Sequence, residues 1–261
     1  MLAINDDDYT LQLIAAVERR AAQLGFVVDR IAVEPYADNP AGLTRMLQAR
    51  GITGLLLPPG RVPQSLAGLL DWMQFATVAM SYSITEPRFH RVVPHHFHNA
   101  ALVLRTLRER GYQRPAFAVD GGVRVRANHA YTGALAADAA TAGTTPLPPF
   151  FGDEKLHGLA AWMRTHRPDA LIVTGTRMIE PALLPELGAM ALDRLGLAVM
   201  HRDPRRPVAG IDQKIGVLGA TAVDLLVAQL HRQDRGPPAD PVVSMIEGVW
   251  VDAPTVKLQA P

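Results

Sequence analysis

The sequence contains no cysteine at all. It therefore has no disulfide bond, no thiolate nucleophile and no cysteine ligand for zinc. A chain without cysteine is in keeping with the cytoplasm, and we expect that location. Long apolar runs are also missing, because no segment approaches the roughly 18 consecutive apolar residues of a membrane-spanning helix. The first eight residues carry no basic segment ahead of their short apolar run, so they do not resemble a secretion signal.

A strong charge of either sign is missing as well. The 26 basic and 25 acidic residues leave a net charge of +1, which gives no long-range attraction to nucleic acid. Any DNA-reading part is therefore not visible in this chain. The motifs of a hydrolase nucleophile elbow, a Walker loop and a dinucleotide fingerprint are all absent from the sequence. We expect no enzymatic activity, no cofactor and no membrane partner.

What the chain does have is a regular alternation of short apolar runs with helical patterns over 261 residues. Such alternation is typical of βαβ units, so we predict the α/β class with parallel sheets. The predicted helices, beyond the first at about 6–24, are 41–50, 64–73, 99–110, 128–141, 156–166, 180–195 and 216–231. The predicted strands are 2–4, 26–33, 54–57, 76–80, 115–119, 171–174, 197–200, 208–213 and 242–250.

The last fifty residues are the most informative part of the pattern. A short apolar segment, Val208–Gln213, leads into a helix that ends near His231, and an apolar strand, Val242–Trp250, follows. One helix and one strand cannot bury their apolar faces against each other alone. They must complete sheets that were begun much earlier in the chain.

This order resembles the end of the effector-binding core of LacI/GalR-family transcriptional regulators. Four further stretches match the family in the right order: Asn5–Phe26, Ala49–Pro59, Leu107–Val119 and Arg167–Thr174. The resemblance implies a fold like that of type I periplasmic binding proteins, with two parallel-sheet lobes and three crossovers between them. The implied N-terminal lobe is 1–93 plus 208–240, and the implied C-terminal lobe is 94–207 plus 241–261.

By the same resemblance we expect a ligand-sensing core that binds a sugar or a similar small polar metabolite between its lobes. We expect a homodimer, formed through the helices near 41–50 and 64–73 and through contacts of the second lobe. DNA would be bound only through a helix-turn-helix headpiece, which this chain does not include. A solute-binding protein of a sugar transporter is the alternative, since it has the same fold.

The chain departs from the family pattern at several pocket positions. His95 and His96 stand where the family usually has Asp-Asn, Ala130 stands where it often has arginine, and Thr176 stands where it often has aspartate. The aspartate after the next strand is kept as Asp203. These departures indicate a ligand different from the commonest ones of the family, or a pocket that binds nothing.

The histidines His90, His95, His96 and His98 could hold a metal ion, because neutral imidazoles bind zinc. However, no acidic residue lies between Glu86 and Glu109 to complete a ligand set, so we predict no metal. Since the segment is the first crossover, His96 and His98 are candidates for hydrogen bonds to a polar ligand. The alternative is a set of histidines with structural partners.

Other candidates follow strands at their carboxyl ends, where open α/β sheets bind ligands. In the first lobe they are Asp8, which is alternatively a helix cap, together with Tyr9 and Tyr82, whose rings suit the apolar face of a sugar.

In the second lobe the candidates are Arg124, Arg126 and Asn128, in the loop after Val119, and Asp203. Arginine can hold a carboxylate or diol by paired donors, and a carboxylate can accept bonds from two hydroxyls. The alternatives are solvated loop residues, a helix cap at Asn128, and a loop salt bridge between Asp203 and Arg202, Arg205 or Arg206.

Overall fold

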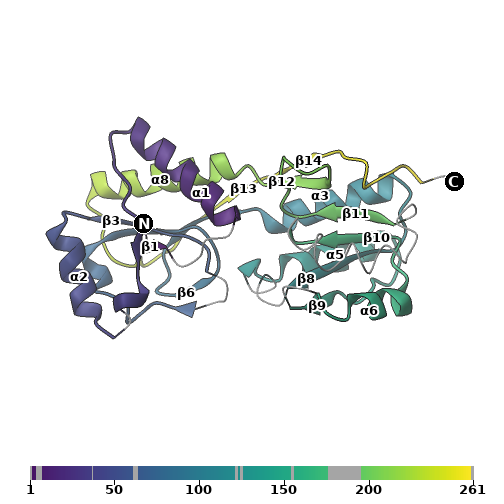
Figure 1. Ribbon diagram of the computed structural model, residues 1–261, viewed down its shortest axis with the longest axis horizontal. Helices are drawn as coiled ribbons and strands as arrows, with labels where there is room; N and C mark the ends of the chain where they lie inside the picture. The colour runs from purple at the N-terminus through teal and green to yellow at the C-terminus, as the bar shows by residue number, and fades with distance from the viewer. Residues whose placement is uncertain are drawn as a thin grey trace. The chain divides into compact units, whose positions relative to one another are not determined.

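The structure is a computed structural model that describes residues 2–3, 8–36, 38–60, 64–120, 123, 126–153, 156–175 and 195–259. The chain forms two compact units, which are Met1–Pro94 with Lys214–Ile246 and His95–Gln213 with Glu247–Pro261. It therefore passes three times from one unit to the other. The predicted α/β class with parallel sheets is confirmed, and Figure 1 shows the elements of each unit. Within the described residues, no helix has the length and apolar character needed to cross a membrane.

The first unit is built on a four-stranded parallel sheet with the order β13-β7-β5-β3. These strands are β3 (Gly54–Leu57), β5 (Ala76–Ala79), β7 (His90–Pro94) and β13 (Val243–Ile246). Two pairs of short parallel strands accompany it: β1 (Leu2–Ala3) with β2 (Ile31–Ala32), and β4 (Gln64–Ser65) with β6 (Ile84–Glu86). The helices are α1 (Asp8–Gln23), η1 (Glu34–Tyr36), α2 (Pro40–Ala49), η2 (Trp72–Gln74) and α8 (Ile215–Arg232).

Both faces of this sheet are buried along β3 and β5. Leu56, Val78 and Val92 pack with α1 and α8 in one apolar cluster, while Leu55 and Ala79 pack in another cluster with residues of α2. Successive side chains of a strand point to opposite faces, so a strand covered on both sides has to be apolar throughout. This explains why β3 and β5 read as short and almost wholly apolar runs, whereas the edge strand β13 leaves Val243 and Met245 exposed.

Helices α1 and α8 lie side by side, although they come from opposite ends of the chain (Figure 1). Gly219 of α8 makes this contact possible. A β-carbon added at Gly219 would come within 2.7 Å of the β-carbon of Ala16 in α1. The backbones of α1 and α8 can therefore approach each other closely, because Gly219 has no side chain.

The second unit contains a six-stranded sheet with the order β14-β12-β11-β10-β8-β9, in which only β14 is antiparallel to its neighbour. The strands are β8 (Pro115–Asp120), β9 (Phe150–Gly152), β10 (Ala170–Val173), β11 (Gly196–Val199), β12 (Ala209–Asp212) and β14 (Val249–Val251). Helices α3 (His96–Glu109) and α5 (Ala130–Thr141) cover one face, and α6 (Leu159–His166) covers the other.

The boundaries of the units differ from those expected for the lobes 1–93 plus 208–240 and 94–207 plus 241–261. Strand β12 pairs with β11 and β14 and so belongs to the second unit, whereas β13 pairs with β7 and so belongs to the first. The single strand predicted at 242–250 is in fact two strands in different sheets.

The break between these two strands falls at Glu247 and Gly248. The Gly248 amide donates a hydrogen bond of 2.8 Å to the side-chain oxygen of buried Asn99, and an added β-carbon at Gly248 would lie 2.5 Å from the Ile211 side chain. This close packing turns the chain out of one sheet and into the other.

The helix predicted over 64–73 is wrong. The segment contains β4, turns and the short η2, and its apolar residues Leu66, Leu70 and Trp72 are buried in the cluster below the sheet. The Trp72 indole donates to the Leu66 carbonyl at 2.9 Å, and Gly68 weakens any helix through the middle of the segment. A dimer contact through a helix at this position is therefore ruled out.

Two other predicted elements differ from the expectation. The strand expected over 26–33 is only Ile31–Ala32, and Val27 before it is 94% exposed. The helix expected over 180–195 falls largely outside the described residues.

The contact between α1 and α8 can be tested with two glycines of the same helix. Gly219→Ala should lower the free energy of unfolding by about 1–2 kcal/mol, because the new methyl group overpacks the contact with Ala16. Gly216→Ala meets nothing within 4 Å and should raise it by about 0.5–1 kcal/mol through helix propensity. Urea unfolding of both variants measures the difference, and equal effects would show that the helix contact is not tight.

Candidate ligand-binding site

Polar side chains gather at the carboxyl ends of β3 and β5 in the first unit. The hydroxyl oxygens of Ser81 and Ser83 lie 2.5 Å apart, and Ser83 Oγ also accepts a hydrogen bond of 2.8 Å from the Gly60 amide. Gly60 follows β3 and the serines follow β5, so these bonds tie together the loops of two neighbouring strands. Open parallel sheets bind ligands at such an edge.

Arg91 of β7 holds the loop that follows β5. Its side chain is buried and donates to the carbonyl oxygens of Ser81 and Ile84, both at 2.8 Å. Its guanidinium carbon lies 5.7 Å from the centre of the Tyr82 ring, which is a cation–π distance. Tyr82 therefore lies in the sequence between Ser81 and Ile84, whose carbonyl groups are both held by Arg91.

Burial raises the pKa of the Tyr82 hydroxyl, while the positive charge of Arg91 acts in the opposite direction. The hydroxyl is thus protonated at neutral pH and can both donate and accept a hydrogen bond. Its half-buried ring keeps one part accessible. Tyr82 has the properties that the sequence-based hypothesis requires of a ligand contact.

Asp8 and Tyr9 form the start of α1. Asp8 is exposed and lies in the first turn, where a carboxylate is favoured by the helix dipole. Tyr9 is half-buried and packs against the apolar cluster between α1 and α8. The position of Asp8 matches the helix-end alternative, and the packing of Tyr9 leaves part of its ring exposed.

In the second unit, three histidines surround the amino end of α3. His95 caps the helix, because its Nδ1 accepts a hydrogen bond of 3.2 Å from the His98 amide, and the two rings lie 5.6 Å apart. His98 Nδ1 lies 3.7 Å from a carboxylate oxygen of Glu247. The described residues contain no group of three side chains arranged to hold a metal ion.

His96 has different surroundings. Its Nδ1 lies 3.3 Å from the Tyr131 hydroxyl, and the two rings meet edge to face at 5.7 Å. Tyr131 is in turn stacked on Phe117 of β8, with 5.6 Å between ring centres. The imidazole is therefore positioned by the first turn of α5 and by the core strand below it.

Burial lowers the pKa of His96 to about 4, with smaller contributions in the same direction from the nearby His95 and Arg126. The imidazole is therefore neutral at pH 7 and offers one donor and one acceptor. Such a group suits a neutral hydroxyl better than an anion. Half-buried Arg126 lies close enough to His96 to influence its charge, so two predicted site residues are brought together.

The remaining predicted residues are distributed as follows. Arg124 lies outside the described residues. Asn128 is exposed, with a left-handed backbone (φ 51°), and the helix cap predicted for it falls on His129 instead. Asp203 accepts hydrogen bonds from Arg205 on both carboxylate oxygens, at 2.9 and 2.8 Å.

The contact with Arg205 lowers the pKa of Asp203 below its usual value. The alternative foreseen for this residue, a loop salt bridge, is thus what the structure contains. A carboxylate held in this way is ionised, and both of its oxygens are engaged, because Oδ1 also accepts from the Arg205 amide at 2.9 Å and Oδ2 from Arg205 Nε at 3.1 Å.

Sequence reasoning missed several residues of these clusters. Arg91 could have been noticed as a charged residue directly before the apolar pair Val92 and Val93, and Ser81 and Ser83 as a polar pair just after a strand. No local signal marks Tyr131, since its role depends on the packing of α5 against α3 and β8.

Two parallel-sheet units that one chain crosses three times define the periplasmic-binding-protein-like fold of type I, and this chain has that fold. No protein-family model matches the sequence, and no curated protein matches it at the sequence level.

Solved structures do match. The lac repressor dimer bound to operator and the anti-inducer ONPF is 18% identical, with a TM-score of 0.71 over 98% of this chain and 80% of that one. The complex of the transcriptional regulator CelR with cellobiose is 18% identical, with a TM-score of 0.72 over 97% and 83%.

A periplasmic binding protein/LacI transcriptional regulator from Alkaliphilus metalliredigens QYMF, complexed with D-xylulofuranose, is 12% identical, with a TM-score of 0.72 over 98% and 97%. At these identities the similarity establishes the fold, and it covers nearly the whole chain.

The neutral state of His96 has a consequence for stability. Its pKa is about 4 in the folded state and 6.5 in the unfolded chain, so acid protonates the unfolded state first. The contribution of neutral His96 to the free energy of unfolding is fully present above about pH 6.5 and is lost as the pH falls toward 4. The loss between about pH 7.5 and 5.0 is about 2 kcal/mol.

Urea unfolding at both pH values measures this loss. His96→Gln keeps a hydrogen-bonding side chain and removes the titration, so its loss should be smaller by about 2 kcal/mol. An unchanged pH dependence in that variant would place the titration on another group.

Proposed function

We propose that this chain is the ligand-sensing core of a LacI-type transcriptional regulator and that it binds a sugar or a similar small polar metabolite. The observation that carries the proposal is the fold, since it is similar over 96–99% of the chain to regulators, among them the CelR–cellobiose complex. The polar clusters at the carboxyl ends of both sheets support it.

In this proposal each unit carries candidate ligand contacts. The first contributes Tyr82 and Tyr9, whose rings suit the apolar face of a sugar, with Asp8 nearby in the chain. The second contributes two groups of opposite character: neutral His96, with His98 beside it, and charged Arg126, with Arg124 and Asn128 in the same loop. Asp203, which Arg205 holds at both carboxylate oxygens, is the acidic candidate for a contact with ligand hydroxyls.

The ligand would act by changing the balance between conformations of the two units, because it can favour only the conformation to which it binds more tightly. We propose that the protein acts as a homodimer in the cytoplasm and does not catalyse a reaction. In a regulator of this type, contact with DNA would require a helix-turn-helix headpiece.

A solute-binding protein of a sugar transporter is the second candidate. It is favoured by one match, which is described as a periplasmic binding protein as well as a LacI regulator. The gene sequence upstream of this segment separates the two, because a helix-turn-helix would support the regulator and a secretion signal the transporter protein.

Ligand binding can be tested by thermal shift with cellobiose, D-xylulose and a panel of other sugars. A ligand that binds only the folded state should raise the melting temperature as its concentration rises. For a sugar that does so, Arg126→Gln should reduce its affinity about tenfold, since a bond to a charged donor is lost. Arg19→Gln, a matched removal of an exposed arginine on α1, should leave the affinity unchanged.

The absence of any shift across the panel would count against a sugar sensor. A shift that Arg126→Gln leaves intact would remove that residue from the site without contradicting the function.

A further inference from the structure

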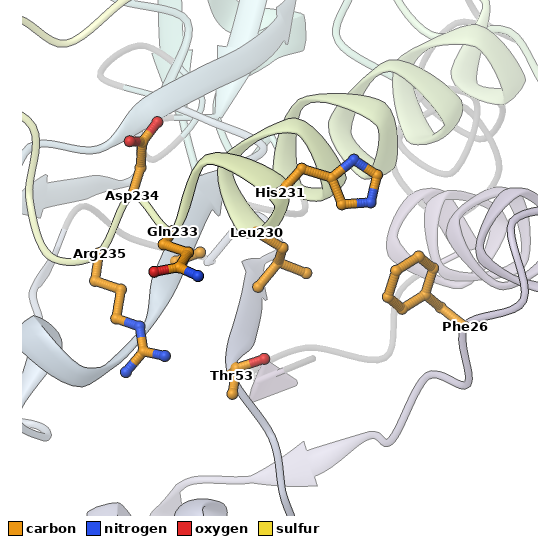
Figure 2. A pocket seen from close by; sticks show the side chains of 8 residues that line it. Phe26, Thr53, Leu230, His231, Gln233, Asp234 and Arg235 are labelled. Atoms are coloured by element: carbon orange, nitrogen blue, oxygen red, sulfur yellow. The ribbon is translucent and has the colours of Figure 1, made fainter.

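The described residues contain a hollow that the proposed function does not use. It lies in the first unit at the amino ends of β3 and β5, next to the carboxyl end of α8, and has a volume of about 370 Å³ (Figure 2). The polar clusters of the candidate ligand site lie at the opposite, carboxyl edge of the same strands. Small-ligand sites in proteins have volumes of about 300–1,000 Å³, so this hollow is large enough for one.

One side of the hollow is apolar. Ala76 begins β5 and is buried, Leu230 comes from the last turn of α8, and the Phe26 ring is 39% exposed. Figure 2 shows Leu230 at the centre of the lining and Phe26 beside it. These three side chains would cover the flat hydrocarbon part of a bound ligand.

The backbone around the hollow is fixed by hydrogen bonds. The Phe26 amide donates to the Ala21 carbonyl at 2.9 Å at the end of α1, and the Ala76 amide donates to the Thr53 carbonyl at 2.9 Å. The loop after α8 is tied down as well, because the Gly236 amide donates to the Phe75 carbonyl at 3.0 Å. The walls therefore belong to ordered structure on every side.

The other side of the hollow carries positive charge without a partner. Asp234 is already paired with Arg232 at 2.7 Å, and Figure 2 shows its carboxylate pointing away from Thr53 and Leu230. Arg235 and His231 also line the hollow, and neither side chain forms a hydrogen bond or ion pair within the described part of the chain. An exposed arginine with all its donors available binds a carboxylate through two parallel hydrogen bonds.

We infer that this hollow is a second ligand site, separate from the effector site, and that it takes a small aromatic carboxylate. The hydrocarbon part lies against Phe26, Leu230 and Ala76, and the carboxylate is bound by Arg235, which lies across Leu230 from Phe26 and His231 (Figure 2). Thr53 and Gln233 supply further polar atoms at the rim. The inference concerns the first unit alone and does not depend on the sugar site.

Calorimetric titration with 2-naphthoate and with its neutral analogue 2-naphthamide tests the inference. The protein should bind naphthoate about tenfold more tightly than the amide, because only the anion pairs with Arg235. Arg235→Gln should abolish this preference and leave the affinity for the amide unchanged. Phe26→Ala should weaken both probes about fivefold through lost apolar contact.

Arg19→Gln is the matched control, since it removes an exposed arginine from α1 in the same unit and should alter neither affinity. Amide chemical shifts recorded with naphthoate should move at residues 26, 53 and 230–235. The inference is overturned if naphthoate does not bind, if both probes bind equally, or if Arg235→Gln leaves the preference in place. Because no sugar is used, failure here leaves the proposed function standing.

Discussion

A parallel sheet has to be covered on both faces, and in the first unit that requirement reaches almost the full length of the chain. Helix α1 alone does not cover the face formed by Leu56, Val78 and Val92. The rest of that face is covered by α8, which begins only at residue 215. The close approach of Gly219 to Ala16 lets both helices lie on one small sheet. The same passage delivers β13 to the edge beside β7. The discontinuous units and the three crossings are therefore consequences of covering one sheet.

Much of this fold could be predicted from the sequence, because the strands are covered on both sides and so appear as short apolar runs. Gly54–Leu57 was predicted with the observed bounds, and the helix before Gly111 differs by only a few residues at its start. The pattern fails where an apolar residue is buried by a loop instead of a helix face. The segment 64–73 is such a case, since Leu66 and Trp72 are held by a bond between the Trp72 indole and the Leu66 backbone.

The sheet to which a strand belongs is equally hidden from the sequence. Val242–Trp250 is one apolar run, yet its two halves pair with different partners, because the chain turns at Gly248 against Asn99. Alternating polarity reports burial, but it does not say which neighbour provides it.

The candidate site shows the same division. Residue types and strand ends pointed to Tyr82, His96 and Arg126, and the structure brings the last two close together. What the sequence could not supply is the set of partners. Three arginines lie near Asp203 in the sequence, and the structure shows that Arg205 pairs with it. Tyr131 comes within hydrogen-bond distance of His96 only through the packing of α5 on α3.

The three crossings also order events during synthesis on the ribosome. The first unit begins at the amino end, but one face of its sheet lacks its second helix until residue 232 has been made, and the sheet lacks an edge strand until residue 246. By then β8, β10 and β11 of the second unit have already been made, and they pair with one another without any later segment. The apolar face of the part that is translated first therefore stays exposed until the later segments are made. Pairing between segments so far apart in the sequence is intrinsically slow. In this fold, the order of translation is not the order in which the units can be completed.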